Sequence, residues 1–265
     1  MSDQQRRLGQ YPTPQWVADA LVERHFADLG RGDTVIEPSC GPGRFLQALP
    51  PEVAAVGVEL DPQLAALAAQ LTGRPIIHGD FTTVELDVEP TAIIGNPPFQ
   101  LGLIDRFLER AHTLLPNEGR VGFILPAYAF QTAARVAGYG ERWSITQEFI
   151  PRNIYQGLKL PLVFATFTKD RRRALVGFAL YREATEVQRL PRRVHELLET
   201  ATGSAWKAVV QYALEQLGGE APLEAIYEVV AGCRPTENTA WQAQVRKVVR
   251  QAFRCTGPAR YALAA

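Results

Sequence analysis

The sequence predicts an α/β protein in which helices cover a mostly parallel sheet of seven strands, followed by a small helical domain. Three observations carry this prediction: short apolar runs alternate with helical spacings up to residue 125, β-rich segments follow residue 144, and helical spacings return after residue 200. Strand–helix alternation implies parallel strands covered by helices, because consecutive parallel strands need a crossover connection. The 265 residues suffice for both parts, and we expect domains at residues 1–190 and 200–265.

Apolar spacing gives the elements of the first domain. A helix over residues 15–29 follows Pro14, which suits a first helical turn. The expected parallel strands are 34–36, 54–58, 75–77, 92–94 and 121–125, and the helices between them are 45–49, 62–71 and 101–115. Segments 144–150, 162–168 and 174–181 are β-rich, so we expect them to complete the sheet with an antiparallel hairpin at one edge.

The second domain begins after residues 189–193, which are typical of the start of a linker. Its expected elements are three helices and a short strand, at residues 206–217, 222–231, 239–253 and 261–263.

Composition excludes several function classes. The 28 basic and 28 acidic side chains cancel, so a nucleic-acid partner would have to bind a local patch. Three distant cysteines and four scattered histidines indicate neither a disulfide framework nor a metal site. No apolar run approaches the roughly 18 residues of a membrane span. We therefore expect a soluble, cytoplasmic protein without a metal or a membrane partner.

A glycine-containing loop at residues 37–45 follows the first expected strand and opens a helix. Glycines let the backbone approach a ligand, and the helix N-terminus offers amides to an anion, although a tight turn alone would also need them. Glu37, at the end of the strand, would repel a pyrophosphate but can receive the ammonium of an amino acid.

Two further acids follow the next two strands. Glu59 lies near the roughly 20-residue spacing at which a carboxylate binds ribose hydroxyls, whereas Asp61 beside it is suited to capping a helix. Asp80-Phe81 offers an acceptor for an adenine amine and an aromatic face, and a simple turn acid is the alternative for Asp80. Ligands of open α/β sheets bind at the carboxyl ends of the strands, where all three acids are expected. Together the acids could bind a nucleoside joined to an amino acid, and S-adenosylmethionine is such a molecule.

Asn96-Pro97-Pro98-Phe99 follows the fourth expected strand. An Asn amide and a Pro-fixed carbonyl can together accept hydrogen bonds from a flat amine, and the aromatic ring can stack on the rest of a heterocycle. The alternative is a rigid turn that only ends the strand.

These motifs, preceded by Tyr11-Pro12-Thr13-Pro14, resemble those of the class I S-adenosylmethionine-dependent methyltransferases with a Rossmann-like sheet, and among them the DNA adenine-N6 methyltransferases of the gamma motif order. The resemblance covers residues 8–130 closely. It implies that the catalytic residues are Asn96, Pro97, Pro98 and Phe99. It implies that the cofactor site comprises Tyr11, Thr13, Glu37, Pro38, Ser39, Gly41, Gly43, Phe45, Glu59, Leu60, Asp80, Phe81 and Asn96.

The function that the resemblance implies is transfer of a methyl group from S-adenosylmethionine to the N6 amine of an adenine flipped out of double-stranded DNA. Tyr155 lies where relatives place a target-base loop, and a core aromatic is the alternative. The large target-recognition domain of many relatives is not recognisable, so stringent recognition of a long site is not expected. Three other functions stay open: methylation of RNA adenine, methylation of a protein glutamine, and an inactive DNA-binding regulator. A restriction-system partner is compatible with the resemblance.

The second domain resembles a winged-helix module of the kind found beside restriction and chromatin proteins. Arg246, Arg250 and Arg254 are spaced to share one face of the last expected helix, where they could pair with DNA phosphates. A solvated helix face is the alternative, as it is for the basic cluster at residues 171–173.

Overall fold

The computed structural model describes residues 12–151, 154–155, 158, 160–171, 174–178, 186–200, 204–235 and 239–263. The chain divides into two compact units, Met1–Phe178 and Ala179–Ala265. Each unit is described by itself.

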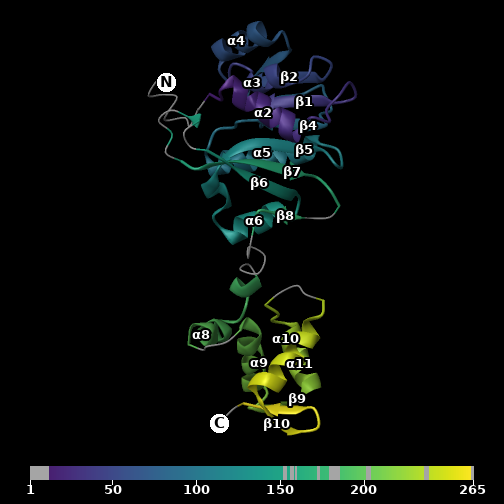
Figure 1. The fold of residues 1–265 in the computed structure, drawn as a ribbon, viewed down its shortest axis with the longest axis vertical. Coiled ribbons are helices and arrows are strands. Elements are labelled where there is room, and N and C mark those ends of the chain that lie inside the picture. Colours follow the sequence, from purple (N-terminus) through teal and green to yellow (C-terminus); the bar gives the residue numbers. More distant parts are fainter. Residues whose placement is uncertain are drawn as a thin grey trace. The chain divides into compact units, whose positions relative to one another are not determined.

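The first unit is built on a single eight-stranded sheet (Figure 1). Its strands are β1 (Thr34–Pro38), β2 (Ala54–Glu59), β3 (Ile76–His78), β4 (Ala92–Gly95), β5 (Arg120–Pro126), β6 (Ser144–Ile150), β7 (Leu162–Thr168) and β8 (Leu175–Val176). The spatial order is β3-β2-β1-β4-β5-β7-β6-β8. Strands β1 to β5 pair in parallel, and β7 lies antiparallel between β5 and β6. The prediction of a mostly parallel, Rossmann-like sheet is confirmed.

The predicted count of seven strands is wrong. Of the β-rich segment 174–181, residues 179–181 lie outside the described residues. The described part contains the two-residue strand β8, which pairs in parallel with Ile145 and Thr146 of β6 and adds an eighth strand at the edge. Backbone pairing continues just before it, because Ile145 N–H donates to the Ala174 carbonyl at 2.7 Å.

The helices of this unit are α2 (Gln15–His25), α3 (Arg44–Ala48), α4 (Pro62–Thr72), α5 (Leu101–Leu114), the 3-10 helix η1 (Ala127–Phe130) and α6 (Ala133–Gly140). Helix α4 begins at Asp61, whose carboxylate accepts the N–H groups of Gln63 and Leu64, and it ends at Gly73 in the left-handed conformation. The sequence did not predict α6, and it extended α2 four residues too far.

The register of the parallel strands determines where the site forms. Glu37 of β1 pairs with Gly57 of β2, and Glu59 of β2 pairs with His78 of β3. Ile36 and Ile93, in the central strands β1 and β4, are fully buried, as expected for a sheet covered on both faces. The acids that follow the apolar runs therefore gather at the carboxyl edge of this sheet.

The second unit combines helices with a small antiparallel sheet. Its elements are α8 (Arg192–Thr200), α9 (Ala205–Gln216), β9 (Glu220–Pro222), α10 (Leu223–Ala231), α11 (Trp241–Ala252), β10 (Arg254–Gly257) and β11 (Arg260–Ala262). The strand order is β10-β11-β9, and Val209, Val210, Ile226, Val245 and Val249 are fully buried in its core.

Two predictions for this unit are wrong. Helix α11 ends at Ala252 because Phe253 takes an extended conformation, so Arg254 begins β10 and does not share a helical face with Arg246 and Arg250. The segment predicted to start a linker instead begins α8, where the buried side chains of Val194 and Leu197 join the core. Within the described parts of the chain, no helix has the length and hydropathy to cross a membrane.

Candidate active site

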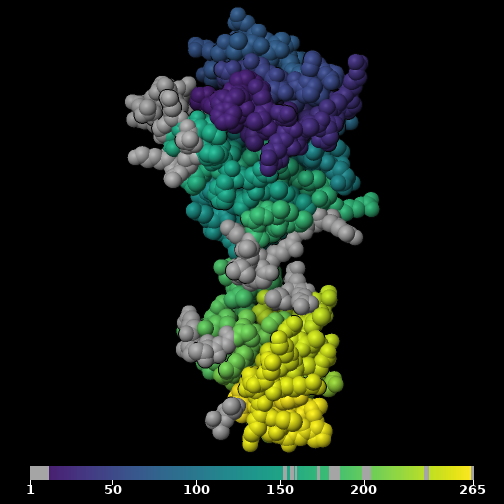
Figure 2. Space-filling view, viewed as in Figure 1, coloured from purple at the N-terminus to yellow at the C-terminus, as the bar shows by residue number. Residues whose placement is uncertain are grey.

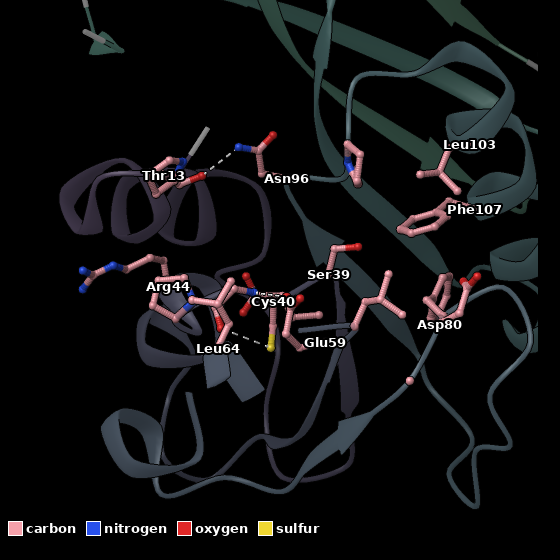
Figure 3. Close-up of a pocket in the computed structure, with 18 of the residues that line it drawn as sticks. Thr13, Ser39, Cys40, Arg44, Glu59, Leu64, Asp80, Asn96, Leu103 and Phe107 are labelled. Carbon is pink, nitrogen blue, oxygen red and sulfur yellow. Dashed lines mark hydrogen bonds between the residues drawn. The ribbon is translucent and has the colours of Figure 1, made fainter. Parts of the chain in front are cut away.

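A cavity of about 500 Å³ opens at the carboxyl edge of β1, β2 and β4. The residues that line it are Pro12, Thr13, Glu37, Ser39, Cys40, Gly41, Pro42, Arg44, Glu59, Leu60, Leu64, Leu67, Gly79, Asp80, Phe81, Asn96, Pro98, Leu103, Arg106 and Phe107. Figure 3 shows Thr13 and Asn96 toward one side of this cavity and Asp80, Leu103 and Phe107 toward the other.

The loop between β1 and α3 forms one wall through an unusual backbone path. Ser39, Gly41 and Gly43 have φ angles of 54°, 52° and 76°, in the region that favours glycine. A Cβ on Gly43 would lie 2.6 Å from the Thr72 side chain, whereas one on Gly41 would meet nothing within 4 Å. Gly43 is therefore required by packing as well as by conformation, while Gly41 keeps the cavity open.

Glu37 lies beneath this loop and is only 3% exposed. Its two carboxylate oxygens accept the N–H groups of Phe45 at 3.4 Å and Leu46 at 2.9 Å, which open α3. Burial raises the pKa of Glu37 to about 8, and the nearby Glu59 carboxylate adds to this rise. A cation in the cavity would favour the ionised form of Glu37.

Glu59 ties the loop to the end of β2. Its Oε2 accepts the Gly41 N–H at 2.7 Å and its Oε1 accepts the Asp61 N–H at 2.9 Å, although the side chain is only 5% exposed. Each carboxylate oxygen has a further lone pair with which to accept a hydroxyl. Asp80, after β3, is held by hydrogen bonds from the Thr82 N–H and hydroxyl, both 2.8 Å from Oδ1.

Asn96 follows β4 at the opposite side of the cavity. Its Nδ2 donates to Thr13 Oγ1 at 3.2 Å, as the dashed line in Figure 3 marks. The Tyr155 hydroxyl donates to the same oxygen at 3.4 Å, and the side chains of Thr13 and Tyr155 are 6% and 5% exposed. Three segments that are distant in the sequence thus meet at one hydroxyl group.

Most of the residues predicted for the site line this cavity. They are Thr13, Glu37, Ser39, Gly41, Glu59, Leu60, Asp80, Phe81, Asn96 and Pro98. The cavity lining does not include four other predicted residues, which are neighbours of lining residues in the sequence: Pro38 at the end of β1, Gly43, Phe45 in α3, and Pro97. Tyr11 lies outside the described residues.

Phe99 and Tyr155 are both in the hydrophobic core cluster of the first unit, and Phe99 is 5% exposed. The structure therefore does not bring the Phe99 ring to the cavity surface, because it packs inside that cluster.

Sequence reasoning missed the wall that α5 supplies. Leu103, Arg106 and Phe107 line the cavity from successive turns of this helix, and Phe81 packs edge-on against Phe107 with ring centroids 5.0 Å apart. The spacing of these residues immediately after the Asn-Pro-Pro-Phe motif was the available signal. Cys40, which also lines the cavity, is 3% exposed, and burial raises the pKa of its thiol.

Comparison with known proteins assigns the fold. No protein-family model matches the chain. A type II methyltransferase, M.CvrRI of Paramecium bursaria Chlorella virus XZ-6E, is 34% identical over 96 residues, which are 34% of this chain and 24% of that protein. The chain thus matches about a quarter of the length of this curated relative.

One solved structure carries the fold assignment, and a second matches more weakly. A candidate class I S-adenosylmethionine-dependent methyltransferase from Listeria monocytogenes superposes with a TM-score of 0.53 and 17% identity, covering 64% of each chain. TrmN from Thermus thermophilus gives a TM-score of 0.48 and 22% identity, covering 58% of this chain and 48% of that one. The first unit has the fold of a class I S-adenosylmethionine-dependent methyltransferase.

The cavity of this methyltransferase fold has the chemistry that S-adenosylmethionine requires. Its carboxylates, Glu37, Glu59 and Asp80, can accept hydrogen bonds from an ammonium, two ribose hydroxyls and an adenine amine. Its apolar side chains, Phe81, Leu103 and Phe107, can cover an aromatic base. The residues present therefore fit the cofactor.

Proposed function

We propose that this protein transfers a methyl group from S-adenosylmethionine to the exocyclic N6 amine of an adenine flipped out of double-stranded DNA. One observation carries the proposal. Asn96 directly follows the carboxyl end of β4 and lines the same cavity as Glu37, Glu59 and Asp80. The cavity can thus hold a nucleoside-bearing cofactor and present an amide oxygen to a flat amine.

The cofactor would lie along the cavity with its amino acid near Glu37 and its adenine near Asp80 and Phe107. Glu37 would then receive the ammonium, and its ionised form would be favoured by that charge. Glu59 would bind the ribose hydroxyls while it continues to hold the Gly41 amide. When bound, the cofactor supplies an electrophilic methyl group on a sulfonium.

The side-chain oxygen of Asn96 and the backbone carbonyl of Pro97 would each accept a hydrogen bond from one N–H of the target amine. The lone pair of an adenine amine is delocalised into the ring, and two acceptors draw the nitrogen toward tetrahedral geometry, where the lone pair can attack. The neutral amine would become a cation as its bond to the methyl carbon forms and the bond from that carbon to the sulfonium sulfur breaks, and it would then lose a proton to water. Positioning and hydrogen bonding therefore supply most of what the protein contributes.

A base in a duplex cannot reach this cavity, so the adenine must leave the stack at a cost of a few kcal/mol. Contacts with the protein must offset that cost. Pro98 lines the cavity and offers an apolar face to the base. Stacking on Phe99, as proposed from the sequence, requires its ring to leave the core cluster.

The second unit supports DNA as the substrate. Its order of elements, α9-β9-α10-α11-β10-β11 with strand β11 central, would suit a winged-helix module in which α11 enters a groove of DNA. Arg246, Lys247 and Arg250 are exposed on α11, and Arg254 and Arg260 are exposed on the β10–β11 hairpin. In Figure 2 the residues of α11 and of this hairpin belong to the yellow surface. Arg260 pairs with Glu220 of β9 at 3.3 Å, whereas residues 241–254 contain no acidic side chain, so the basic residues of α11 can pair with phosphates.

Calorimetry with S-adenosylmethionine tests the first part of this proposal. Purified protein should bind the cofactor, and absence of binding with and without DNA would favour the inactive DNA-binding regulator. Labelled cofactor should then be offered with unmethylated duplex DNA, with RNA and with a glutamine-containing protein. Label in N6-methyladenine of DNA supports the proposal, whereas label only in RNA or only in protein would replace it.

A further inference from the structure

Two tyrosine hydroxyls are linked to the Asn96–Phe99 turn: Tyr155 through Thr13 at the start of the turn, and Tyr128 directly at its end. At the start of the turn, Thr13 Oγ1 accepts two hydrogen bonds, one from Asn96 Nδ2 at 3.2 Å and one from the Tyr155 hydroxyl at 3.4 Å. At the end of the turn, the Tyr128 hydroxyl donates to the Phe99 carbonyl. Tyr128 belongs to η1, directly after β5, and Tyr155 belongs to the segment after β6.

The contact at Thr13 determines which way the Asn96 amide faces. An amide is planar, with its oxygen and nitrogen on opposite sides, so a nitrogen that donates to Thr13 directs the oxygen elsewhere. A hydroxyl oxygen accepts at most two hydrogens, and here Asn96 and Tyr155 supply both. Thr13 is then left with its own proton to donate to a third group, and it does not compete for the Asn96 oxygen.

Without the Tyr155 hydroxyl, the orientation of the Thr13 hydroxyl and of the Asn96 amide is no longer fixed. Thr13 could then rotate and donate to Asn96, which would favour the reversed amide, with nitrogen where the oxygen should face a target amine. A reversed amide repels an amine, because both groups are donors.

We infer that Tyr155 and Tyr128 are positioning residues that fix the acceptor geometry of the Asn96–Phe99 turn: Tyr155 through Thr13, and Tyr128 through the Phe99 carbonyl. This inference rests on the proposed function, in which Asn96 accepts hydrogens from the amine that is methylated. It gives Tyr155 a role inside the protein in place of a contact with the flipped base.

Both phenols are suited to this role because they donate over the whole physiological pH range. Burial raises the pKa of Tyr155 to about 12, and the bond to Thr13 only partly opposes the rise. Burial also raises the pKa of Tyr128. Each tyrosine can be tested by replacement with phenylalanine, which removes one oxygen and keeps the ring in its packing.

The experiment compares Tyr155→Phe, Tyr128→Phe and a matched control, Tyr139→Phe. Tyr139 is a half-buried phenol that donates to Asp105 on α5 and to no residue of the turn among the contacts of the described residues. We expect kcat for methyl transfer, to whichever acceptor the wild type methylates, to fall about tenfold in the first two variants and to stay within about twofold in the control. The Kd for S-adenosylmethionine should stay within about twofold in all three.

Substitutions of Thr13 separate positioning from packing. Adding Tyr155→Phe to Thr13→Ser should lower kcat by about the same factor as it does in the wild type, because serine keeps the hydroxyl. Thr13→Val removes it, and adding Tyr155→Phe to Thr13→Val should lower kcat no further, because both substitutions break the same contact. Full additivity of the two losses would overturn the inference, as would an unchanged kcat in Tyr155→Phe or a loss confined to cofactor affinity.

A measurement that needs no activity distinguishes failure of this inference from failure of the proposed function. The side-chain amide of Asn96, assigned by its absence from the nitrogen-15 spectrum of Asn96→Ala, should exchange faster in Tyr155→Phe than in the wild type or Tyr139→Phe. Equal exchange in all three proteins would overturn the positioning role of Tyr155. A wild type that transfers no methyl group but shows the expected exchange would contradict the proposed function alone.

Discussion

Glu37 should release a proton when S-adenosylmethionine binds. Burial raises the pKa of Glu37 to about 8, so at pH 7 the carboxyl is about nine-tenths protonated before S-adenosylmethionine binds. An ammonium next to it would favour the carboxylate, which returns most of one proton to the buffer. Calorimetry at pH 7 in two buffers with different ionisation enthalpies measures the number of protons released per cofactor bound.

The same carboxyl should make the free energy of unfolding depend on pH when no cofactor is added. The folded pKa of Glu37 is raised from 4.5 to about 8, so its protonated form is favoured by folding. Its contribution to the free energy of unfolding is therefore fully present below pH 4.5 and is lost as the pH rises through about 8. At 1.36 kcal/mol per pKa unit, the loss amounts to about 5 kcal/mol.

Glu37→Gln should remove both effects, whereas the exposed Glu52→Gln should change neither. Urea unfolding at intervals between pH 5 and pH 9 should show a falling free energy of unfolding in the wild type and a flatter profile in Glu37→Gln. Proton release that is the same in the wild type and in Glu37→Gln would refute this account of Glu37.

Three further results are expected. Asn96→Ala should lower methyl transfer by about a hundredfold or more while the Kd for S-adenosylmethionine changes little, and normal turnover would remove Asn96 from the mechanism. Gly43→Ala should lower the free energy of unfolding by about 1–3 kcal/mol, measured with urea, because its φ is 76° and a Cβ would lie 2.6 Å from the Thr72 side chain. Replacing both Arg246 and Arg250 by Ala should reduce the slope of log affinity for DNA against log salt by about 2, and an unchanged slope would leave α11 out of the interface.

The sequence predicted the first unit well because its signals are local. Apolar runs ending in an acid, as at Glu37 and Glu59, identify the carboxyl end of a buried strand without any knowledge of its neighbours. The three acids and Asn96 therefore could be assigned to one edge of the sheet before any geometry was known.

What the sequence missed depends on contacts between distant segments. The bond from Tyr155 to Thr13 joins residues 142 positions apart, and no spacing rule predicts it. The end of α11 was placed too late because Phe253 and Arg254 continue a helical pattern, whereas pairing of Arg254 with Ala262 of β11 draws them into a strand. Tertiary pairing overrides local propensity at such boundaries.

The most direct test is the identity of the methylated product. Wild-type protein should be incubated with labelled S-adenosylmethionine and unmethylated duplex DNA, and the DNA should be digested to nucleosides and separated by mass. The proposed function predicts that the label appears in N6-methyladenine, and that Asn96→Ala, which still binds the cofactor, leaves the DNA unlabelled. Label in a methylated cytosine, or equal labelling by the wild type and Asn96→Ala, would contradict it.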